Sequence, residues 1–292
     1  MHPPRRFLQL DVFADRPGAG NPLAVVLASD GLDTAAMQAF ANWTNLSETA
    51  FLLPPTTPEA SYRVRIFTPR QELSFAGHPS VGAAHAALEA GLASAIDGRL
   101  VQECAAGLLP MQVSGTGEAQ RISVRAPRGR ELPWPSGSEA ALTAIFSAIP
   151  TGAPPAALID NGPQWWCVEL KDEATVRGFQ PPLAAIAALC RADGAVGLAI
   201  FARCPGKDYQ MAVRAFCPAD GIPEDPVTGS ANAAIAAWLS GNDGLDRLGT
   251  HYVVSQGREI GRDGRIAVAI DATGEVWIGG QTQTVVQGAL TW

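Results

Sequence analysis

The chain has few cysteines, few histidines and no long apolar run. The five cysteines lie far apart without a C-x-x-C pair, which argues against a disulfide framework and a structural zinc site. The four histidines show no metal-ligand spacing. No apolar run could span a bilayer, and the first residues lack the apolar stretch of a signal peptide. We therefore expect reduced thiols, no metal, no membrane contact and a cytoplasmic location.

Basic residues are also scarce in this chain. The formal net charge is −7, and the Lys and Arg residues form no run. Such a surface is a poor partner for phosphate backbones, so we expect no nucleic-acid binding. The 292 residues are 47% hydrophobic and 17% charged, a composition that folds and is long enough for two domains. Neither a P-loop nor a G-x-S-x-G or G-x-G-x-x-G motif stands between a strand and a helix.

Short β-type runs alternate with a few helical segments. Apolar spacing and capping residues predict helices over residues 34–43, 80–90, 138–148, 182–191 and 230–239. Alternating or apolar runs predict strands over residues 7–13, 23–27, 48–53, 62–67, 98–103, 110–115, 119–126, 165–170, 196–204, 211–217, 251–256, 265–270, 275–279 and 284–290. Residues 127–154, rich in Pro, Gly and Ser, would otherwise form loops.

The two halves contain the same run of motifs. Arg65-Ile-Phe-Thr-Pro69 precedes a loop and then His78-Pro-Ser-Val-Gly82, and Arg214-Ala-Phe-Cys-Pro218 precedes a loop and then Asp225-Pro-Val-Thr-Gly229. In each half an Ala-rich helix follows. We interpret the chain as an α+β protein of two pseudo-repeated domains, residues 1–118 and 119–292, with a crossing of the last strand back to the first domain left open.

The Ala-rich helix of each half is nearly apolar all round, which is typical of a helix buried on every side. Small side chains allow close approach of the surrounding strands. The pattern therefore predicts a curled, mostly antiparallel β-sheet wrapped around a central helix, rather than a doubly wound parallel sheet.

Each central helix is predicted to start after a Pro-x-x-Gly turn. The first N–H groups of a helix have no partner within it and carry a partial positive charge, which suits a carboxylate. Gly77 with His78, and Gly229 with Ser230, flank the two starts. The alternative is that these glycines serve turn geometry alone.

Four side chains are candidates for acid/base or binding work. His78 and Asp225 occupy equivalent places, each before a proline, where a His could donate a proton and an Asp could hold an ammonium or hydroxyl group. Glu48 precedes an apolar run, where partial desolvation would raise its pKa. Asn21 lies in a Gly-Asn-Pro turn. Surface or structural roles remain the alternatives, and spacing alone does not single out Glu48.

Several motifs together resemble one family. Asp11-Val-Phe-Ala-Asp-Arg-Pro17, Gly20-Asn-Pro-Leu-Ala-Val-Val26, Asn45-Leu-Ser-Glu-Thr49, Phe75-Ala-Gly-His-Pro79 and Gly221-Ile-Pro-Glu-Asp-Pro-Val-Thr-Gly-Ser-Ala-Asn232 follow in order. This sequence resembles the phenazine-biosynthesis PhzF-like proteins of the diaminopimelate-epimerase fold. The likeness runs from residue 7 nearly to the end, including Ser255-Gln-Gly257.

The resemblance implies two β-rich domains with the active site between them, a homodimer and no cofactor. It places Glu48 on the position of the catalytic Glu that moves a proton between ring carbons of a dihydro-hydroxyanthranilate. His78, Asp225 and Ser230 fall on positions that assist or bind substrate. Related epimerases use two cysteines, and this chain has none at either helix start.

We therefore expect a cofactor-independent isomerase that moves a proton on a small carboxylate-bearing substrate. Glu48, His78 and Asp225 are the expected catalytic residues, and Asn21, Gly77, Gly229 and Ser230 the expected binding residues. Two alternatives stay open: an amino-acid racemase or epimerase on the same fold, and a non-catalytic protein that binds a small acid.

Overall fold

The chain forms two compact units. The computed structural model describes residues 4–149, 155–242, 244–246 and 248–292. Met1–Arg125 and Gly279–Trp292 belong to the first unit, and Ala126–Ile278 to the second. The chain thus passes between the units twice, at residues 125–126 and 278–279, and the C-terminal strand lies in the first unit. Among the described residues, no helix is long and apolar enough to cross a membrane.

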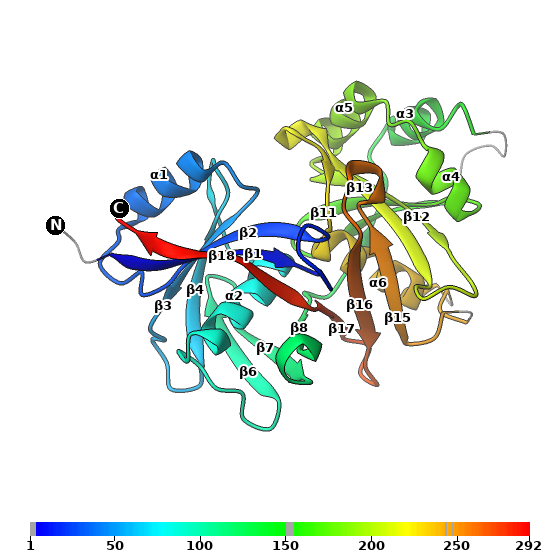
Figure 1. The fold of residues 1–292 in the computed structure, drawn as a ribbon. Coiled ribbons are helices and arrows are strands. Elements are labelled where there is room, and N and C mark those ends of the chain that lie inside the picture. The colour runs from blue at the N-terminus through cyan, green and yellow to red at the C-terminus, as the bar shows by residue number, and fades with distance from the viewer. Residues whose placement is uncertain (1–3, 150–154, 243, 247) are drawn as a thin grey trace. The chain divides into compact units, whose positions relative to one another are not determined.

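The first unit is built on one curled, mostly antiparallel sheet (Figure 1). Its pairings run β18-β1-β2-β3-β4-β6-β7-β8, with β2–β3 and β4–β6 parallel and the rest antiparallel. The strands are β1 (Arg5–Val12), β2 (Asn21–Val26), β3 (Thr49–Leu53), β4 (Tyr62–Phe67), β5 (Glu72–Leu73), β6 (Arg99–Cys104), β7 (Gly107–Ser114), β8 (Arg121–Arg125) and β18 (Thr282–Leu290).

Helix α2 (Gly77–Glu89) lies inside this sheet and contacts strands from both ends of the pairing order, including β1, β4 and β8. Its side chains are small because the strands approach closely. A Cβ on Gly82 would lie 2.5 Å from Leu23 Cδ2 and 2.9 Å from Val12 Cγ2. On the outer face, α1 (Thr34–Thr44) packs Met37 and Phe40 against the sheet. The wrapped central helix that the sequence predicts is therefore present.

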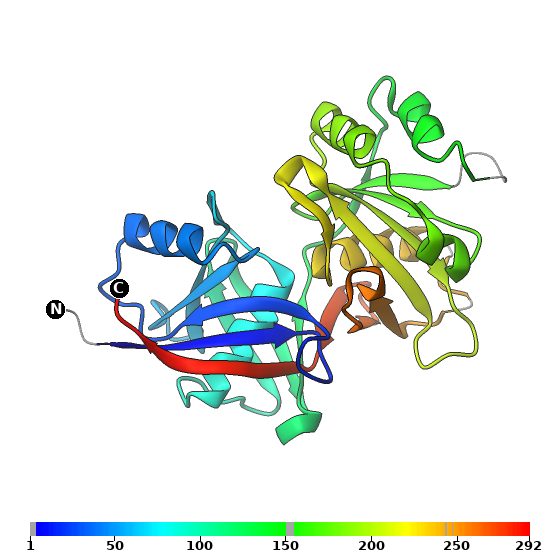
Figure 2. The same ribbon diagram turned by 45° about the horizontal axis from the view of Figure 1, so that its top comes forward.

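The second unit has its own curled sheet, seen in another orientation in Figure 2. Its pairings run β9-β10-β11-β12-β13-β15-β16, with β11–β12 and β13–β15 parallel. The strands are β9 (Arg130–Leu132), β10 (Ala156–Asp160), β11 (Gln164–Glu169), β12 (Gly197–Arg203), β13 (Met211–Cys217), β14 (Ile222–Asp225), β15 (His251–Gln256), β16 (Gly264–Ile270) and β17 (Val276–Gly280), the last of which crosses between the units.

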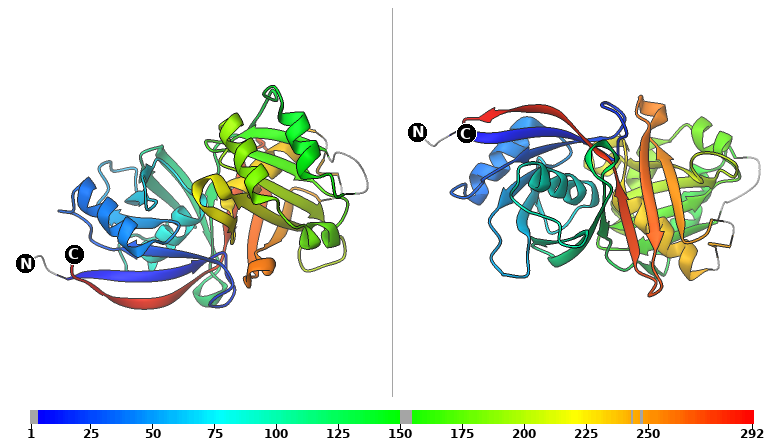
Figure 3. Two further views of the ribbon diagram at one scale, coloured as in Figure 1. Left: turned by 90° about the horizontal axis from the view of Figure 1, so that it is seen from above. Right: turned by 60° about the horizontal axis from the view of Figure 1, so that its bottom comes forward.

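Helix α6 (Gly229–Gly241) is the central helix of this second sheet and contacts β9, β10, β11 and β16. Three helices cover the outer face over a core that includes Trp166, Phe179 and Phe216. They are α3 (Ser138–Ile145), α4 (Glu173–Gly178) and α5 (Leu183–Asp193), which Figure 3 shows on the side away from α6.

The two sheets share an order of pairings. In both, an antiparallel, a parallel and an antiparallel pair are followed by a short strand (β5 or β14) and then by a second parallel pair. The central helix follows the short strand in each case. This shared order fits the pseudo-repeat, which stays a prediction.

The structure corrects several predicted elements. Helix α2 begins at Gly77 rather than at residue 80, so the predicted turn at Pro79–Gly82 is helix, because Pro is tolerated in a first turn whose N–H groups lack partners. In the second half, the turn before Gly229 is confirmed. Strands β9 and β10 and helix α4 were not predicted. Part of the predicted loop segment, residues 150–154, lies outside the described residues.

Candidate active site

Glu48 directly precedes β3 and is partly withdrawn from solvent. Helix α1 ends at Thr44, and the left-handed backbone of its C-cap, Asn45, turns the chain toward β3. Its side chain is 17% exposed. Burial raises the pKa of Glu48 to about 7, and a hydrogen bond from Ser47 only partly opposes this rise. This carboxyl group can therefore both accept and release a proton near neutral pH.

His78, the second residue of α2, faces the Glu48 carboxylate. Its Nε2 atom lies 3.3 Å from Glu48 Oε2, and its side chain is 7% exposed. An imidazole at this distance can stabilise the ionised carboxylate or exchange a proton with it. The structure thus brings together two of the three predicted catalytic residues.

The predicted binding residues of the first unit, Gly77 and Asn21, are buried at the starts of α2 and β2. Gly77 is buried and begins α2, after an N-cap, Ala76, whose side chain makes no capping hydrogen bond. Asn21 starts β2, and Glu48 directly precedes the neighbouring parallel strand β3, so both lie toward the same edge of the sheet. The positive end of α2 therefore lies next to His78 and suits an anionic group.

Asp225 ends β14 in the second unit, where Thr228 holds its carboxylate. The Thr228 hydroxyl donates a hydrogen bond to Asp225 Oδ2. Thr228 is the N-cap of α6, yet its side chain does not cap the helix. An N-cap threonine ordinarily accepts a bond from an early helical N–H. Here the hydroxyl serves Asp225 instead.

Gln256, the last residue of β15, is fully buried and binds the chain before α6. Its amide Nε2 donates to Thr228 Oγ1 (2.8 Å) and to the Asp225 carbonyl (3.1 Å). Its Oε1 accepts from the Thr228 N–H (3.1 Å) and from Asn232 Nδ2 (3.0 Å). Both ends of the amide are thus used, and the segment from Asp225 to the first turn of α6 is held in one arrangement.

Ser230, the second residue of α6, is held by a side chain of β11 and by one from the turn between β10 and β11. Trp165 Nε1 in β11 donates to Ser230 Oγ (3.1 Å), and Asn161 Nδ2 donates to the Ser230 carbonyl (2.9 Å). Gly229 begins the helix and is buried. Gly229, Ser230 and Asp225 therefore all lie at the start of α6, as the sequence predicts.

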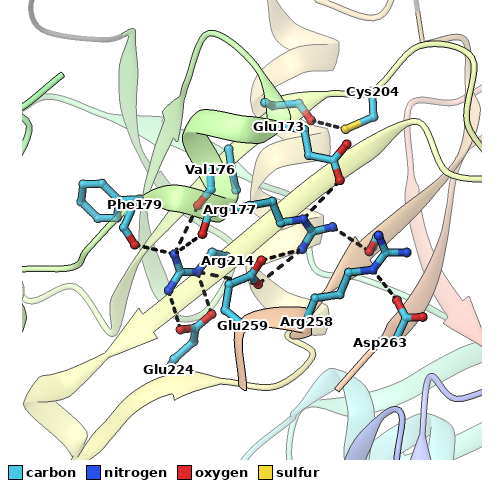
Figure 4. Close-up of polar contacts among 12 residues, drawn as sticks. Glu173, Val176, Arg177, Phe179, Cys204, Arg214, Glu224, Arg258, Glu259 and Asp263 are labelled. Carbon is cyan, nitrogen blue, oxygen red and sulfur yellow. Dashed lines mark hydrogen bonds and ion pairs between the residues drawn. The ribbon is translucent and has the colours of Figure 1, made fainter. Parts of the chain in front are cut away.

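Behind this region an ionic network supports β14 and β15 (Figure 4). Arg214 donates to both oxygens of Glu224, the neighbour of Asp225, at 2.9 and 2.8 Å. It also donates to the carbonyls of Val176 and Phe179 at the end of α4, at 3.2 and 2.6 Å. Arg177 of α4 pairs with Glu259 (3.2 Å) and donates to Ser255 Oγ (2.9 Å), next to Gln256.

Sequence reasoning missed the residues that hold Asp225 and Ser230. Thr228 and Gln256 lie within motifs that carried the family resemblance, but no role was assigned to them. Trp165 begins the strand predicted over residues 165–170. These residues are recognised by the hydrogen bonds that their buried side chains make, and those bonds can be seen only in the folded structure.

The thiols are poorly suited to acid/base work. None of the five cysteines forms a disulfide. Burial raises the pKa of Cys190 to about 12 and that of Cys204 to about 11. Cys217 ends β13 and lies at neither helix start. Within the described residues, His, Cys, Asp and Glu form no group that could hold a metal ion.

Comparison with known proteins supplies the family. Residues 10–288 match the PhzC-PhzF family, described as phenazine biosynthesis-like protein. Antisense-enhancing sequence 1 of Schizosaccharomyces pombe is 34% identical over 97% of each chain. Trans-2,3-dihydro-3-hydroxyanthranilate isomerase of Pseudomonas aeruginosa is 33% identical over 92% of each chain.

A solved structure has the same fold. The Bacillus anthracis phenazine biosynthesis protein of the PhzF family covers 100% of both chains with a TM-score of 0.83 at 24% identity. With motifs, fold and relatives in agreement, the chain belongs to the PhzC-PhzF family and is an isomerase of that family.

Proposed function

We propose that this isomerase moves a proton between carbon atoms of a small carboxylate-bearing substrate, with Glu48 as the acid/base. The observation that carries the proposal is the buried Glu48 carboxyl group 3.3 Å from His78, with a pKa of about 7. A base poised near neutral pH can take a proton and give it back within one turnover.

In the proposed reaction, ionised Glu48 removes a proton from an acidic C–H bond. The electron pair delocalises toward an unsaturated or carbonyl group of the substrate. The protonated Glu48, whose proton can exchange with solvent before delivery, then protonates another carbon, so the enzyme returns to its starting state. His78 stabilises the changing charge of the carboxyl group, and Asp225 and Ser230 bind polar groups of the substrate.

The substrate class follows from the polar groups and from one relative. The starts of α2 and α6 suit a carboxylate, and Asp225 suits an amino or hydroxyl group. The Pseudomonas aeruginosa relative is named for trans-2,3-dihydro-3-hydroxyanthranilate, which carries all three groups. We propose this compound, or a related cyclic or unsaturated amino acid, as the substrate.

Proton exchange followed by NMR in D₂O tests this proposal. Trans-2,3-dihydro-3-hydroxyanthranilate and a panel of small amino and hydroxy acids would be incubated with the wild type and with Glu48→Gln. We expect isomerisation of one member, with deuterium entering at carbon. Loss of a general base should slow the reaction by about 100- to 10,000-fold in Glu48→Gln.

Glu89→Gln is the matched control. Glu89 also lies 3.3 Å from a histidine, His85, on the same helix α2, but away from its start. We expect Glu89→Gln to react like the wild type. Full turnover by Glu48→Gln would overturn the assignment of Glu48. Inversion at a single stereocentre would indicate a racemase or epimerase, and binding without exchange would indicate a non-catalytic protein.

A further inference from the structure

The start of α6 presents two binding groups whose hydrogen-bond polarity is fixed by their neighbours. We propose that Trp165 and Thr228 are positioning residues, which make Ser230 a donor and Asp225 an acceptor toward the ligand. The inference rests on the proposed function in one respect, the binding of substrate by Asp225 and Ser230. It assigns the kind of ligand atom that each must meet.

Trp165 determines the polarity of Ser230. An indole N–H can only donate, so Ser230 Oγ must act as acceptor in the 3.1 Å bond from Trp165 Nε1. The hydroxyl proton of Ser230 then remains for another partner. Since Trp165 is 1% exposed and cannot rotate away, Ser230 offers a donor to any ligand at the start of α6. Its partner must be an acceptor, such as a carboxylate oxygen.

Gln256 and Thr228 determine the polarity of Asp225. Gln256 Nε2 donates to Thr228 Oγ1 at 2.8 Å, so the Thr228 proton is directed to Asp225 Oδ2. The opposite amide orientation is excluded because Gln256 Oε1 accepts the Thr228 N–H. An Asp carboxylate that receives this bond stays an acceptor. Its ligand partner must be a donor, such as an amino or hydroxyl group.

Contacts within the protein hold this arrangement in place. Arg214 fixes Glu224 next to Asp225, and Arg177 fixes Ser255 next to Gln256. Gly257 follows at φ +94°, and a Cβ there would lie 2.5 Å from the Pro226 carbonyl oxygen, so only glycine allows β15 to end so close to this loop. Binding groups held in place by such neighbours lose little freedom when the ligand binds. Ser230 and Asp225 therefore select a ligand that carries both an acceptor and a donor, as an amino or hydroxy acid does.

Isothermal titration with anthranilate and benzoate tests the assignment without any need for turnover. Anthranilate carries a carboxylate and an amino group, whereas benzoate lacks the donor for Asp225. We expect Thr228→Val to weaken anthranilate binding about 10-fold or more and benzoate binding less than about twofold, since a bond to a charged group is the stronger kind. Thr228→Ser, which keeps the hydroxyl, should bind both ligands like the wild type.

Trp165→Phe should weaken both ligands by about 3- to 10-fold, because it releases the Ser230 hydroxyl, which then need not face the carboxylate. Trp166→Phe is the matched control. Trp166 is the adjacent buried indole and packs in the core beneath α3, α4 and α5. Its Nε1 donates to Asp193, the last residue of α5 (3.0 Å), and not to Ser230. Its loss should lower stability by a similar amount while leaving both affinities unchanged.

Equal losses for both ligands in Thr228→Val, or equal losses in Trp165→Phe and Trp166→Phe, would overturn the proposal, as would failure of the wild type to bind anthranilate. The two proposals fail separately. If Glu48→Gln retains turnover while the ligand pattern holds, the acid/base assignment is wrong and the polarity assignment stands. If Glu48→Gln is inactive but the variants do not change ligand binding as expected, the polarity assignment is wrong and the acid/base assignment stands.

Discussion

Glu48, the proposed acid/base, illustrates how a buried carboxyl group lowers the stability of the fold that contains it. A carboxylate withdrawn from water is less stable when ionised, which is why its pKa is about 7 rather than 4.5. The same shift that suits Glu48 to its proposed role as a base at neutral pH therefore penalises the folded chain whenever Glu48 carries its charge.

This penalty predicts that Glu48→Gln gains stability against unfolding in a pH-dependent way. Between pH 4.5 and pH 7 the folded chain binds the Glu48 proton and the unfolded chain does not, so stability falls as pH rises through this window. A pKa change from 4.5 to about 7 corresponds to about 3 kcal/mol. We expect Glu48→Gln to match the wild type below pH 4.5 and to be more stable by up to that amount at pH 8.

Urea denaturation of both proteins at pH 4, 6 and 8 measures this difference. The difference in the free energy of unfolding should grow through the window and level off above pH 7. A difference independent of pH would mean that Glu48 keeps an ordinary pKa in the fold, and it would remove the main support for its role as a base.

At the residue scale, the sequence predicted the candidate site residues but not the side chains that hold them in place. Glu48 was singled out by the family resemblance, because a Glu before an apolar run is surface in most proteins. The contact between Glu48 and His78 joins segments 30 residues apart and depends on how α2 lies against β3, which no local pattern encodes. The bonds of Trp165 and Gln256 depend on strand register in the same way.

At the scale of elements, the repeated Arg motif makes the same contacts in both units. Arg65 donates to both oxygens of Glu72 on β5 (2.7 and 2.6 Å), as Arg214 does to Glu224 on β14 (2.9 and 2.8 Å). Each guanidinium also lies 5.1 Å from the ring of the Phe two residues on. The surroundings differ, since the Arg65 and Glu72 side chains are 26% and 31% exposed and those of Arg214 and Glu224 6% and 9%.

The difference in burial predicts unequal effects of the same substitution. Arg214→Met leaves Glu224 charged and buried and removes the donor to the α4 carbonyls, so we expect a loss of about 3–5 kcal/mol. Arg65→Met breaks a pair that water can replace, and we expect a loss below about 1 kcal/mol. Urea denaturation of both variants measures the two losses. Comparable values would show that the network in Figure 4 does not stabilise the second unit.

Elements with strong apolar patterns were predicted well, and those defined by capping or pairing were not. Strands β4, β13 and β15 have the predicted bounds, because each is an apolar or alternating run between clear breaks. Helix α4 spans six residues and rests on Asp172, which caps Thr175 N–H at 2.8 Å, and on Arg214 at its other end. The Asp172 cap could have been predicted from the sequence, whereas the contact with Arg214 could not, because it joins segments far apart in the chain.

At the scale of the whole molecule, the chain closes its first unit last. β18 pairs with β1 from Arg5↔Leu290 to Val12↔Thr282. The first strand of the chain therefore gains this partner only when the last strand is in place. β18 also touches the central helix, where Thr284 Oγ1 lies 3.0 Å from His85 Nε2. The second unit, between them in sequence, needs none of these pairings.

A truncation that removes residues 282–292 should therefore unfold the units unequally. We expect the amides of β1 and β2 to lose protection in hydrogen-exchange mass spectrometry, because β1 loses a partner along its full length and α2 loses part of its cover. The amides of β12 and β13 should stay protected. Removal of Thr291 and Trp292 alone is the control, since it deletes the Trp292 contacts with Phe40, Trp43 and the Ala36 carbonyl but leaves the β1–β18 pairing intact. Equal loss of protection in both units would show that they fold as one cooperative body, in which the final strand stabilises the start of α6 as much as the start of α2.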